Sequence, residues 1–249
     1  MKKHIPNAIT ALNLICGCLA ITNAFTGELY ISSILIFAAA IFDFMDGAAA
    51  RLLKVSSPLG EQLDSLADMV SFGLAPGIML FQFTKHLNTV YQSPILTENP
   101  WLFYIALIIP VFSAFRLAKF NIDTRQADGF IGLATPANTL FFSCIVLVYF
   151  FPDLPQLINT KNMVLPIISN PIILLGLGNI FSILLVLEIP MFSLKVKSLK
   201  WKGNELRFTF LGLFFLLLSL LNITAFPLII LIYIIWSTII SLIAKKQQS

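Results

Sequence analysis

Residues 43 to 68 carry the pattern Asp43-Phe-Met-Asp46-Gly47-Ala-Ala-Ala50-Arg51, followed by Gly60, Asp64 and Asp68. The four aspartates stand at the facing ends of two apolar segments that a short polar connection joins. An ionised carboxylate in or near hydrocarbon costs at least about 2.5 kcal/mol, so four of them together require a compensating cation. The stretch therefore indicates a pair of membrane helices and the place where we expect the chemistry.

The composition of the whole chain agrees with a membrane protein. Of its 249 residues 58% are hydrophobic and only 11% are charged, whereas about 25% of the residues in a soluble domain are charged. Several apolar runs reach the roughly 18–20 residues that a helix needs to cross a bilayer. We therefore predict an all-α fold, a polytopic membrane helical bundle that forms a single domain over residues 1–249.

Breaks in the hydrophobic pattern divide the chain into eight expected membrane spans. Polar residues, proline or glycine separate the apolar runs. The expected spans cover residues 8–26, 30–51, 62–83, 101–121, 133–151, 170–193, 206–222 and 225–244. The catalytic core is expected over residues 5–193, with two additional spans in residues 206–244.

The distribution of basic residues predicts the orientation. With eight spans, all 16 Lys and Arg residues except Lys85 and Lys161 fall on one side of the membrane. They are Lys2, Lys3, Arg51, Lys54, Arg116, Lys119, Arg125, Lys195, Lys197, Lys200, Lys202, Arg207, Lys245 and Lys246. The positive-inside rule makes this side cytoplasmic, with both termini inside and the acidic site near that face. The net charge of +4 then reflects topology and contact with anionic membrane lipids, and no nucleic acid is expected as a partner.

Helical spacing brings the acidic residues onto two facing surfaces. Positions 43, 46, 47, 50 and 51 are related by i, i+3, i+4, i+7 and i+8, and they form one face of the first helix. Asp64 and Asp68 are related by i, i+4 on the second helix. Two antiparallel helices joined by a short loop are neighbours, so the two acidic faces can meet.

Four converging carboxylates suit hard divalent cations such as Mg²⁺ or Mn²⁺, and two such ions would balance their charge. Mg²⁺ usually shares its coordination shell with substrate phosphates. Gly47 and Ala50 leave the same helix face bare, and Arg51 offers a guanidinium fork that suits phosphate. These features predict a pyrophosphate site at the membrane surface. The alternatives are a buried charge network with Arg51 and Lys54, and a cation transporter, because acids within spans often mark ion pathways.

The string Asp43-x2-Asp46-Gly47-x2-Ala50-Arg51-x8-Gly60-x3-Asp64-x3-Asp68 resembles the CDP-alcohol phosphotransferase family and matches every fixed position of its signature. Members of that family transfer a phosphatidyl or phosphoalcohol group from a CDP-alcohol to a hydroxyl acceptor and release CMP. The resemblance implies a homodimer and two divalent metal ions, Mg²⁺ or Mn²⁺.

The resemblance also implies roles for individual residues. Asp43, Asp46, Asp64 and Asp68 would hold the two metal ions, and Asp68 would also accept the proton of the acceptor hydroxyl. The CDP-diacylglycerol site would comprise Gly47, Arg51, Ser57, Pro6, Asn7 and Thr10.

Flanking segments narrow the resemblance to the CDP-diacylglycerol–serine O-phosphatidyltransferases. The first is Pro6-Asn-Ala-Ile-Thr-Ala-Leu-Asn13-Leu-Ile-Cys-Gly17. The others are Asp64-Ser-Leu-Ala-Asp68-Met-Val-Ser71-Phe-Gly73-Leu-Ala-Pro76, Phe115-Arg116-Leu-Ala-Lys119-Phe-Asn121, and Gly132-Leu-Ala134-Thr-Pro136-Ala-Asn138. In the last segment, Ala134 replaces the proline usually seen there. The resemblance implies an inner-membrane enzyme of phospholipid biosynthesis that converts CDP-diacylglycerol and L-serine to phosphatidylserine and CMP.

An acceptor site for serine needs a cation for the carboxylate. Arg116 and Lys119 stand at the cytoplasmic end of the fourth expected span, and Asn121 is a supporting polar contact. Arg116 is the preferred carboxylate ligand. The same residues would also suit glycerol-3-phosphate, and this acceptor or inositol is the alternative.

Overall fold

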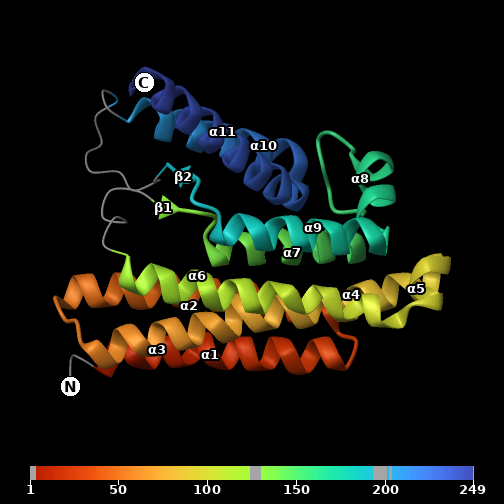
Figure 1. Ribbon diagram of the computed structural model, residues 1–249, viewed down its shortest axis with the longest axis horizontal. Helices are drawn as coiled ribbons and strands as arrows, with labels where there is room; N and C mark the ends of the chain where they lie inside the picture. The colour runs from red at the N-terminus through yellow and green to blue at the C-terminus, as the bar shows by residue number, and fades with distance from the viewer. Residues whose placement is uncertain (1–3, 124–129, 193–200, 202–203, 249) are drawn as a thin grey trace.

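The computed structural model describes residues 4–123, 130–192, 201 and 204–248, and its fold is almost entirely helical (Figure 1). The main helices are α1 (His4–Phe25), α2 (Leu29–Leu53), α3 (Pro58–Asp68), α4 (Ala75–Tyr91), α6 (Ile108–Ile122), α7 (Thr135–Phe150), α9 (Pro171–Val186), α10 (Glu205–Leu221) and α11 (Ala225–Gln248). Shorter segments are η1 (Met69–Leu74), α5 (Pro94–Glu98), η2 (Pro100–Leu107), α8 (Lys161–Ile168) and η4 (Asn222–Thr224). Strands β1 (Phe130–Ile131) and β2 (Pro190–Met191) form a short antiparallel pair.

The membrane character predicted from the sequence is confirmed. Among the described residues, five helices are long and apolar enough to cross a membrane, or six if the bent pair α8 and α9 counts as one span. The chain is thus an integral, multi-pass membrane protein. Each expected span has a helix in the structure, but α7 has only 16 residues, so the number eight stays a prediction.

The expected span over residues 170–193 is wrong in its extent. Helix α9 ends at Val186, where Leu187 takes an extended conformation, and the chain continues into β2. Pro171 lies at the start of α9, and the chain bends by 79° between α8 and α9. A proline favours the first turn of a helix and cannot continue a preceding one, which explains the break.

The chain termini and the turns between helices lie at two opposite ends of the bundle. Helix α1 begins and α11 ends at the same end of the molecule, where the turn between α2 and α3 and the β1–β2 pair also lie (Figure 1). Helices α5 and α8 lie at the opposite end. Of the basic residues used to predict orientation, Lys2, Lys3, Arg125, Lys195, Lys197, Lys200 and Lys202 lie outside the described residues.

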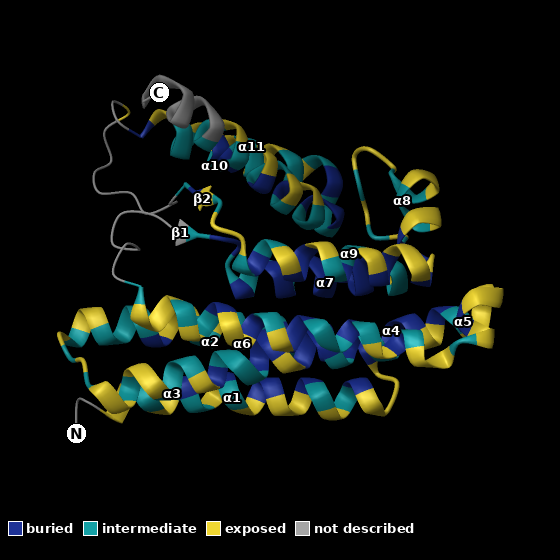
Figure 2. Cartoon of the chain, viewed as in Figure 1, coloured by how far each residue is buried: buried dark blue, intermediate teal, exposed yellow. Residues whose placement is uncertain are grey.

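The buried core lies where α4, α7 and α9 pack together, and the outward faces are mostly exposed (Figure 2). Phe83, Phe142 and Phe181 are almost fully buried there. The rings of Phe141 and Phe181 stack with centroids 4.1 Å apart. Through this core, α7 and α9 pack against α4 and α6. The latter two helices extend toward the acidic residues.

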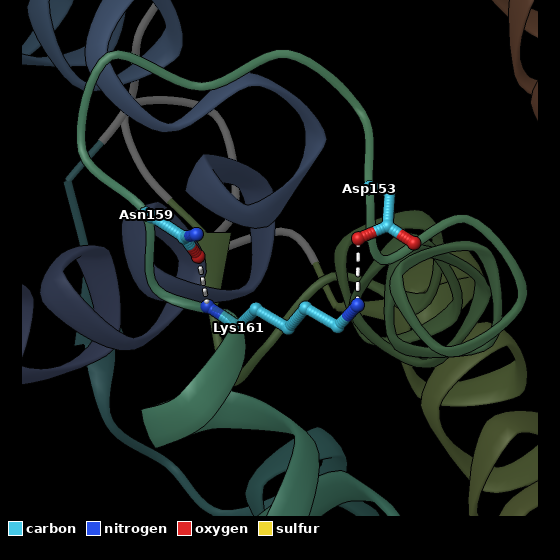
Figure 3. A network of polar contacts seen from close by, with 3 residues as sticks. All are labelled: Asp153, Asn159 and Lys161. Atoms are coloured by element: carbon cyan, nitrogen blue, oxygen red, sulfur yellow. Dashed lines mark hydrogen bonds and ion pairs between the residues drawn. The ribbon is translucent and has the colours of Figure 1, made fainter.

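A loop at the end opposite the acidic residues attaches the C-terminal hairpin of α10 and α11. The Lys161 ammonium donates to Asp153 Oδ1 at 2.6 Å, and its backbone N–H donates to Asn159 Oδ1 at 3.0 Å (Figure 3). The backbone N–H groups of Leu157 and Ile158 both donate to the carbonyl of Leu220 in α10. The hairpin also packs on α7 through α11, so it adds to the bundle without contributing the acidic residues.

Candidate metal and substrate site

The four aspartates lie on a helical hairpin, as the sequence predicted. Helix α2 ends at Leu53, and the left-handed backbone of the following Lys54 (φ 53°) turns the chain back. Ser57 then caps α3 by accepting a hydrogen bond from the Gly60 N–H at 3.1 Å, and Pro58 occupies the first helical turn. A serine cap followed by proline is a strong signal for a helix start. The acidic residues of α2 and α3 consequently face one another.

Three of the four carboxylates form a cluster. Asp43, Asp64 and Asp68 each offer one oxygen, and these oxygens all lie within 4.8 Å of one another. The three side chains are half-buried, and Asp64 Oδ1 is buried without a hydrogen-bond partner among the described residues. Carboxylate oxygens at such separations repel one another unless a cation or a shared proton lies between them, and oxygen ligands of this kind suit Mg²⁺ or Mn²⁺. The donor set therefore fits a divalent metal site.

Asp46 is oriented differently from the other three. It is only 6% exposed, and Thr10 of α1 donates a hydrogen bond to its Oδ2 at 2.6 Å. It lies outside the cluster of three and lines a neighbouring cavity together with Asp64. Thr10 also lines this cavity, but its hydroxyl is turned toward the carboxylate, an interaction that the sequence did not suggest.

The smaller cavity, of about 140 Å³, collects most of the residues predicted for CDP-diacylglycerol. Pro6, Asn7, Thr10, Gly47 and Ser57 all line it. Arg51 does not line the cavity. Its Nη1 would be 3.3 Å from a Cβ at Gly47, which places the exposed guanidinium beside the bare stretch of α2. The cavity therefore has an acidic wall, a glycine face and a cation at its edge.

A larger cavity of about 550 Å³ lies on the other side of the carboxylate cluster. Asp43, Asp64 and Asp68 line it together with Arg116 and Asn121. Because Asp64 lines both cavities, the carboxylates stand where the two spaces meet. A reaction between a group held in one cavity and a group held in the other would take place at these oxygens.

Arg116 is held in the wall of the larger cavity. Its side chain is 5% exposed, its Nε donates to the carbonyl of Leu133 at 3.2 Å, and its guanidinium lies 5.2 Å from the ring centroid of Phe120. The segment that supplies this carbonyl is fixed in turn, because the Gly132 and Leu133 N–H groups donate to carbonyls at Ile189 and Leu184. The two contacts restrict the guanidinium to this wall.

Lys119, the other predicted acceptor cation, lies elsewhere. It does not line the cavity, and its ammonium forms an ion pair with Glu188 at 2.5 Å. Asn121 lines the cavity and exchanges hydrogen bonds with Ser65 across the α3–α6 contact. The structure thus brings Arg116 and Asn121 to the carboxylates and directs Lys119 toward the segment that follows α9.

One polar contact of the cluster was not predicted from the sequence. Asn13 in α1 donates from Nδ2 to Asp68 Oδ1 at 3.1 Å and is 0% exposed. The available signal was its spacing, because Asn13 follows Thr10 by three residues and shares its helix face in an otherwise apolar run. Helix α1 therefore contacts Asp46 through one residue and Asp68 through another.

Sequence comparisons show which known proteins this chain resembles. A sequence profile of CDP-alcohol phosphatidyltransferase matches residues 3–177. The CDP-diacylglycerol–serine O-phosphatidyltransferase of Bacillus subtilis (strain 168) is 34% identical over 148 residues, which cover 59% of this chain and 76% of that protein. The enzymes of the same name from Methanocaldococcus jannaschii and Mycobacterium leprae (strain TN) are 37% and 34% identical over 55% of this chain. The matches span 57% and 44% of those two proteins.

Proposed function

The chain belongs to the CDP-alcohol phosphatidyltransferase family, and from this premise we propose that it transfers the phosphatidyl group of CDP-diacylglycerol to L-serine. The products are phosphatidylserine and CMP, and the reaction is a step of phospholipid biosynthesis. One observation carries the proposal, namely the carboxylates that stand between two cavities, one suited to a nucleotide diphosphate and one containing a buried Arg. The names of the relatives support serine as the acceptor.

The smaller cavity is the site for the CDP group. Gly47 keeps α2 free of side chain where the pyrophosphate approaches, and Arg51 at its edge provides a cation for a phosphate oxygen. Pro6, Asn7 and Ser57 line the nucleotide side of the cavity. The diacylglycerol part extends into the membrane, where the exposed faces of the helices are apolar.

Divalent metal ions are used throughout this family, and the carboxylates provide the ligands for them. We assign two ions, Mg²⁺ or Mn²⁺, to Asp43, Asp46, Asp64 and Asp68. When bound, they neutralise charge on the pyrophosphate and on the departing CMP. The surplus of negative charge in the cluster makes the site strongly dependent on these ions.

Asp68 is the proton acceptor of the reaction. It lines the larger cavity, where the acceptor enters, and a carboxylate within hydrogen-bond reach of a hydroxyl acts as a general base. The serine hydroxyl oxygen forms a bond to the phosphorus that carries the diacylglycerol, and its proton moves to Asp68. The bond from that phosphorus to the oxygen of CMP breaks, and CMP leaves with the electron pair.

Arg116 binds the serine carboxylate. Its Nε donates to the Leu133 carbonyl, and we assign its two terminal nitrogens, which take no part in that hydrogen bond, to a carboxylate in the cavity. A planar guanidinium suits a carboxylate better than an ammonium does. The Asn121 side chain, in the same cavity, provides a further polar contact. Lys119 is assigned to the ion pair with Glu188 instead of to the acceptor.

The membrane arrangement follows from the charge pattern. We assign eight spans, with both termini and the carboxylates on the cytoplasmic side of the inner membrane. In this arrangement only two of the 16 basic residues, Lys85 and Lys161, lie on the outer side. Residues 1–249 form one domain, with the catalytic core in residues 5–193. A homodimer is assigned from the resemblance to the family.

The proposal is tested by CMP release from purified protein in detergent micelles that contain CDP-diacylglycerol and Mn²⁺ or Mg²⁺. Serine, glycerol-3-phosphate and inositol are supplied separately. We expect release with serine, and loss of release with a chelator or with Asp68→Asn. Release with another acceptor alone would contradict serine as substrate, and absence of metal-dependent release with all three would contradict the reaction itself.

A further inference from the structure

Asn13 is a buried amide in contact with the proposed base. It lies in the middle of α1, is 0% exposed, and donates from Nδ2 to Asp68 Oδ1 at 3.1 Å. A polar side chain in this position needs a partner, because burial removes it from water. Its partner comes from α3, so the contact joins two helices that are far apart in sequence.

The backbone around Asn13 is fixed by a close helix contact. The Ser71 hydroxyl of η1 donates to the Asn13 carbonyl at 3.0 Å. A Cβ at Gly17 would lie only 2.9 Å from Ser71 Cα, so α1 approaches η1 more closely than any larger residue would allow. Since η1 follows Asp68 directly, these contacts hold the amide and the carboxylate at a constant separation.

The orientation of the amide is also determined. Its Oδ1 is buried and has no hydrogen-bond partner among the described residues. Rotating the amide by a half turn would place this oxygen against the Asp68 carboxylate, and two acceptors would then face each other. An unsatisfied buried oxygen is unfavourable, and it is retained here because the NH₂ group is needed at Asp68.

We propose that Asn13 is a positioning residue that acts through Asp68. This inference rests on the proposed function, in which Asp68 takes the proton of the acceptor hydroxyl. By donating to Asp68 Oδ1, the Asn13 amide restrains rotation of the Asp68 carboxylate, so that this carboxylate meets the acceptor hydroxyl in the same orientation in each cycle. Misplacement of a reacting group by about 1 Å can reduce the rate about 100-fold.

The test compares Asn13→Ala and Asn13→Leu with the wild-type enzyme in detergent. Leucine has the same branching and the same number of side-chain heavy atoms as asparagine, so this variant removes the hydrogen bond without opening a cavity, whereas Asn13→Ala removes it without adding bulk. We expect kcat to fall about 10- to 100-fold in both variants, with KM for CDP-diacylglycerol and for serine changed less than about threefold. Asn23→Ala is the matched control, because Asn23 lies on the same helix and its Nδ2 donates, within the described part of the chain, to the Leu19 carbonyl of its own helix.

Two further measurements separate positioning from a structural role. Because Asp68 is also a proposed metal ligand, kcat is compared at saturating Mn²⁺, with Mn²⁺ binding followed by electron paramagnetic resonance, and the fall in kcat is expected to persist there. In an Asp68→Ala background, Asn13→Leu is expected to change the residual rate less than about threefold, because the residue through which it acts is absent. A loss of about 10- to 100-fold in that background as well, or a wild-type kcat once Mn²⁺ is saturating, would assign Asn13 to the structure of the site and overturn the proposal.

The failure of this inference is distinct from failure of the proposed function. An active wild-type enzyme with an unchanged kcat in Asn13→Leu would refute the role of Asn13 and leave the reaction standing. A wild-type protein that binds Mn²⁺ but releases no CMP with serine would refute the reaction, and the role of Asn13 with it.

Discussion

Replacing Thr10 by valine tests how α1 supports the metal site. Valine has nearly the same shape as threonine, so the main change is loss of the hydroxyl that donates to Asp46 Oδ2 at 2.6 Å. A hydrogen bond to a charged group contributes about 1.5–3 kcal/mol. At about 1.4 kcal/mol for each factor of ten, this corresponds to about 10- to 150-fold in an equilibrium constant.

The loss should appear in metal binding, because Asp46 is one of the proposed ligands. Removing a hydrogen-bond partner of a ligating side chain typically weakens metal affinity about 10- to 100-fold, which agrees with the magnitude above. The assay measures the Mn²⁺ concentration that gives half-maximal CMP release, together with direct Mn²⁺ binding by electron paramagnetic resonance. We expect this Mn²⁺ concentration and the Mn²⁺ dissociation constant both to rise by at least about tenfold in Thr10→Val.

Thr22→Val is the matched control, because Thr22 lies on the same helix, is exposed, and donates only to the Leu19 carbonyl. The sequence alone suggested instead that Thr10 contacts the nucleotide. In that case KM for CDP-diacylglycerol would rise and the metal requirement would stay at the wild-type value. That result would refute the role assigned to the Asp46 contact.

Three further predictions concern the acceptor site and the fold. Arg116→Lys loses the planar guanidinium, so KM for serine should rise about tenfold or more while KM for CDP-diacylglycerol is unchanged. A serine KM equal to that of the wild type would show that Arg116 does not bind the acceptor. Lys119→Ala should change serine KM less than about threefold and stability by at most about 1 kcal/mol, because its ion pair is partly exposed; a large rise in serine KM would restore Lys119 as a ligand. Gly132→Ala should lower the thermal unfolding midpoint in detergent, because φ is +78° and a Cβ would lie 2.7 Å from the Leu185 carbonyl, at a cost of at least about 1–2 kcal/mol. Gly212→Ala, in an open position of α10, is the control for that measurement and should leave the midpoint unchanged or raise it.

The acidic hairpin could be predicted from the sequence because it depends on local rules. Helical spacing puts Asp64 and Asp68 on one face, whereas the helix begins at Pro58 after the Ser57 cap, before the expected bound at residue 62. The short connection then returns the chain so that the carboxylates of the two helices meet, while both helices pack against α1. These relations involve residues near one another in the chain, so no knowledge of the remaining fold was needed.

Other features depend on tertiary contacts that the sequence pattern does not contain. The π-helical turn η1 interrupts what was expected as one regular span, and its wider turn shifts the register of the side chains after Asp68. The ion pair of Lys119 joins residues that are 69 positions apart. The hydrogen bonds of Thr10 and Asn13 likewise depend on how α1 packs against the hairpin. Residues of this kind were visible in the sequence, but their partners were not.

The central claim is that the carboxylates between the two cavities catalyse transfer of a phosphatidyl group to serine. The most direct test supplies isotopically labelled serine to the purified protein in vesicles that contain CDP-diacylglycerol and Mn²⁺, and then measures labelled phosphatidylserine and CMP in the same sample. We predict that the two products appear in equal amounts and that both are lost with a chelator or with Asp68→Asn. Release of CMP without labelled lipid, or labelled lipid at the wild-type rate from Asp68→Asn, would contradict the claim.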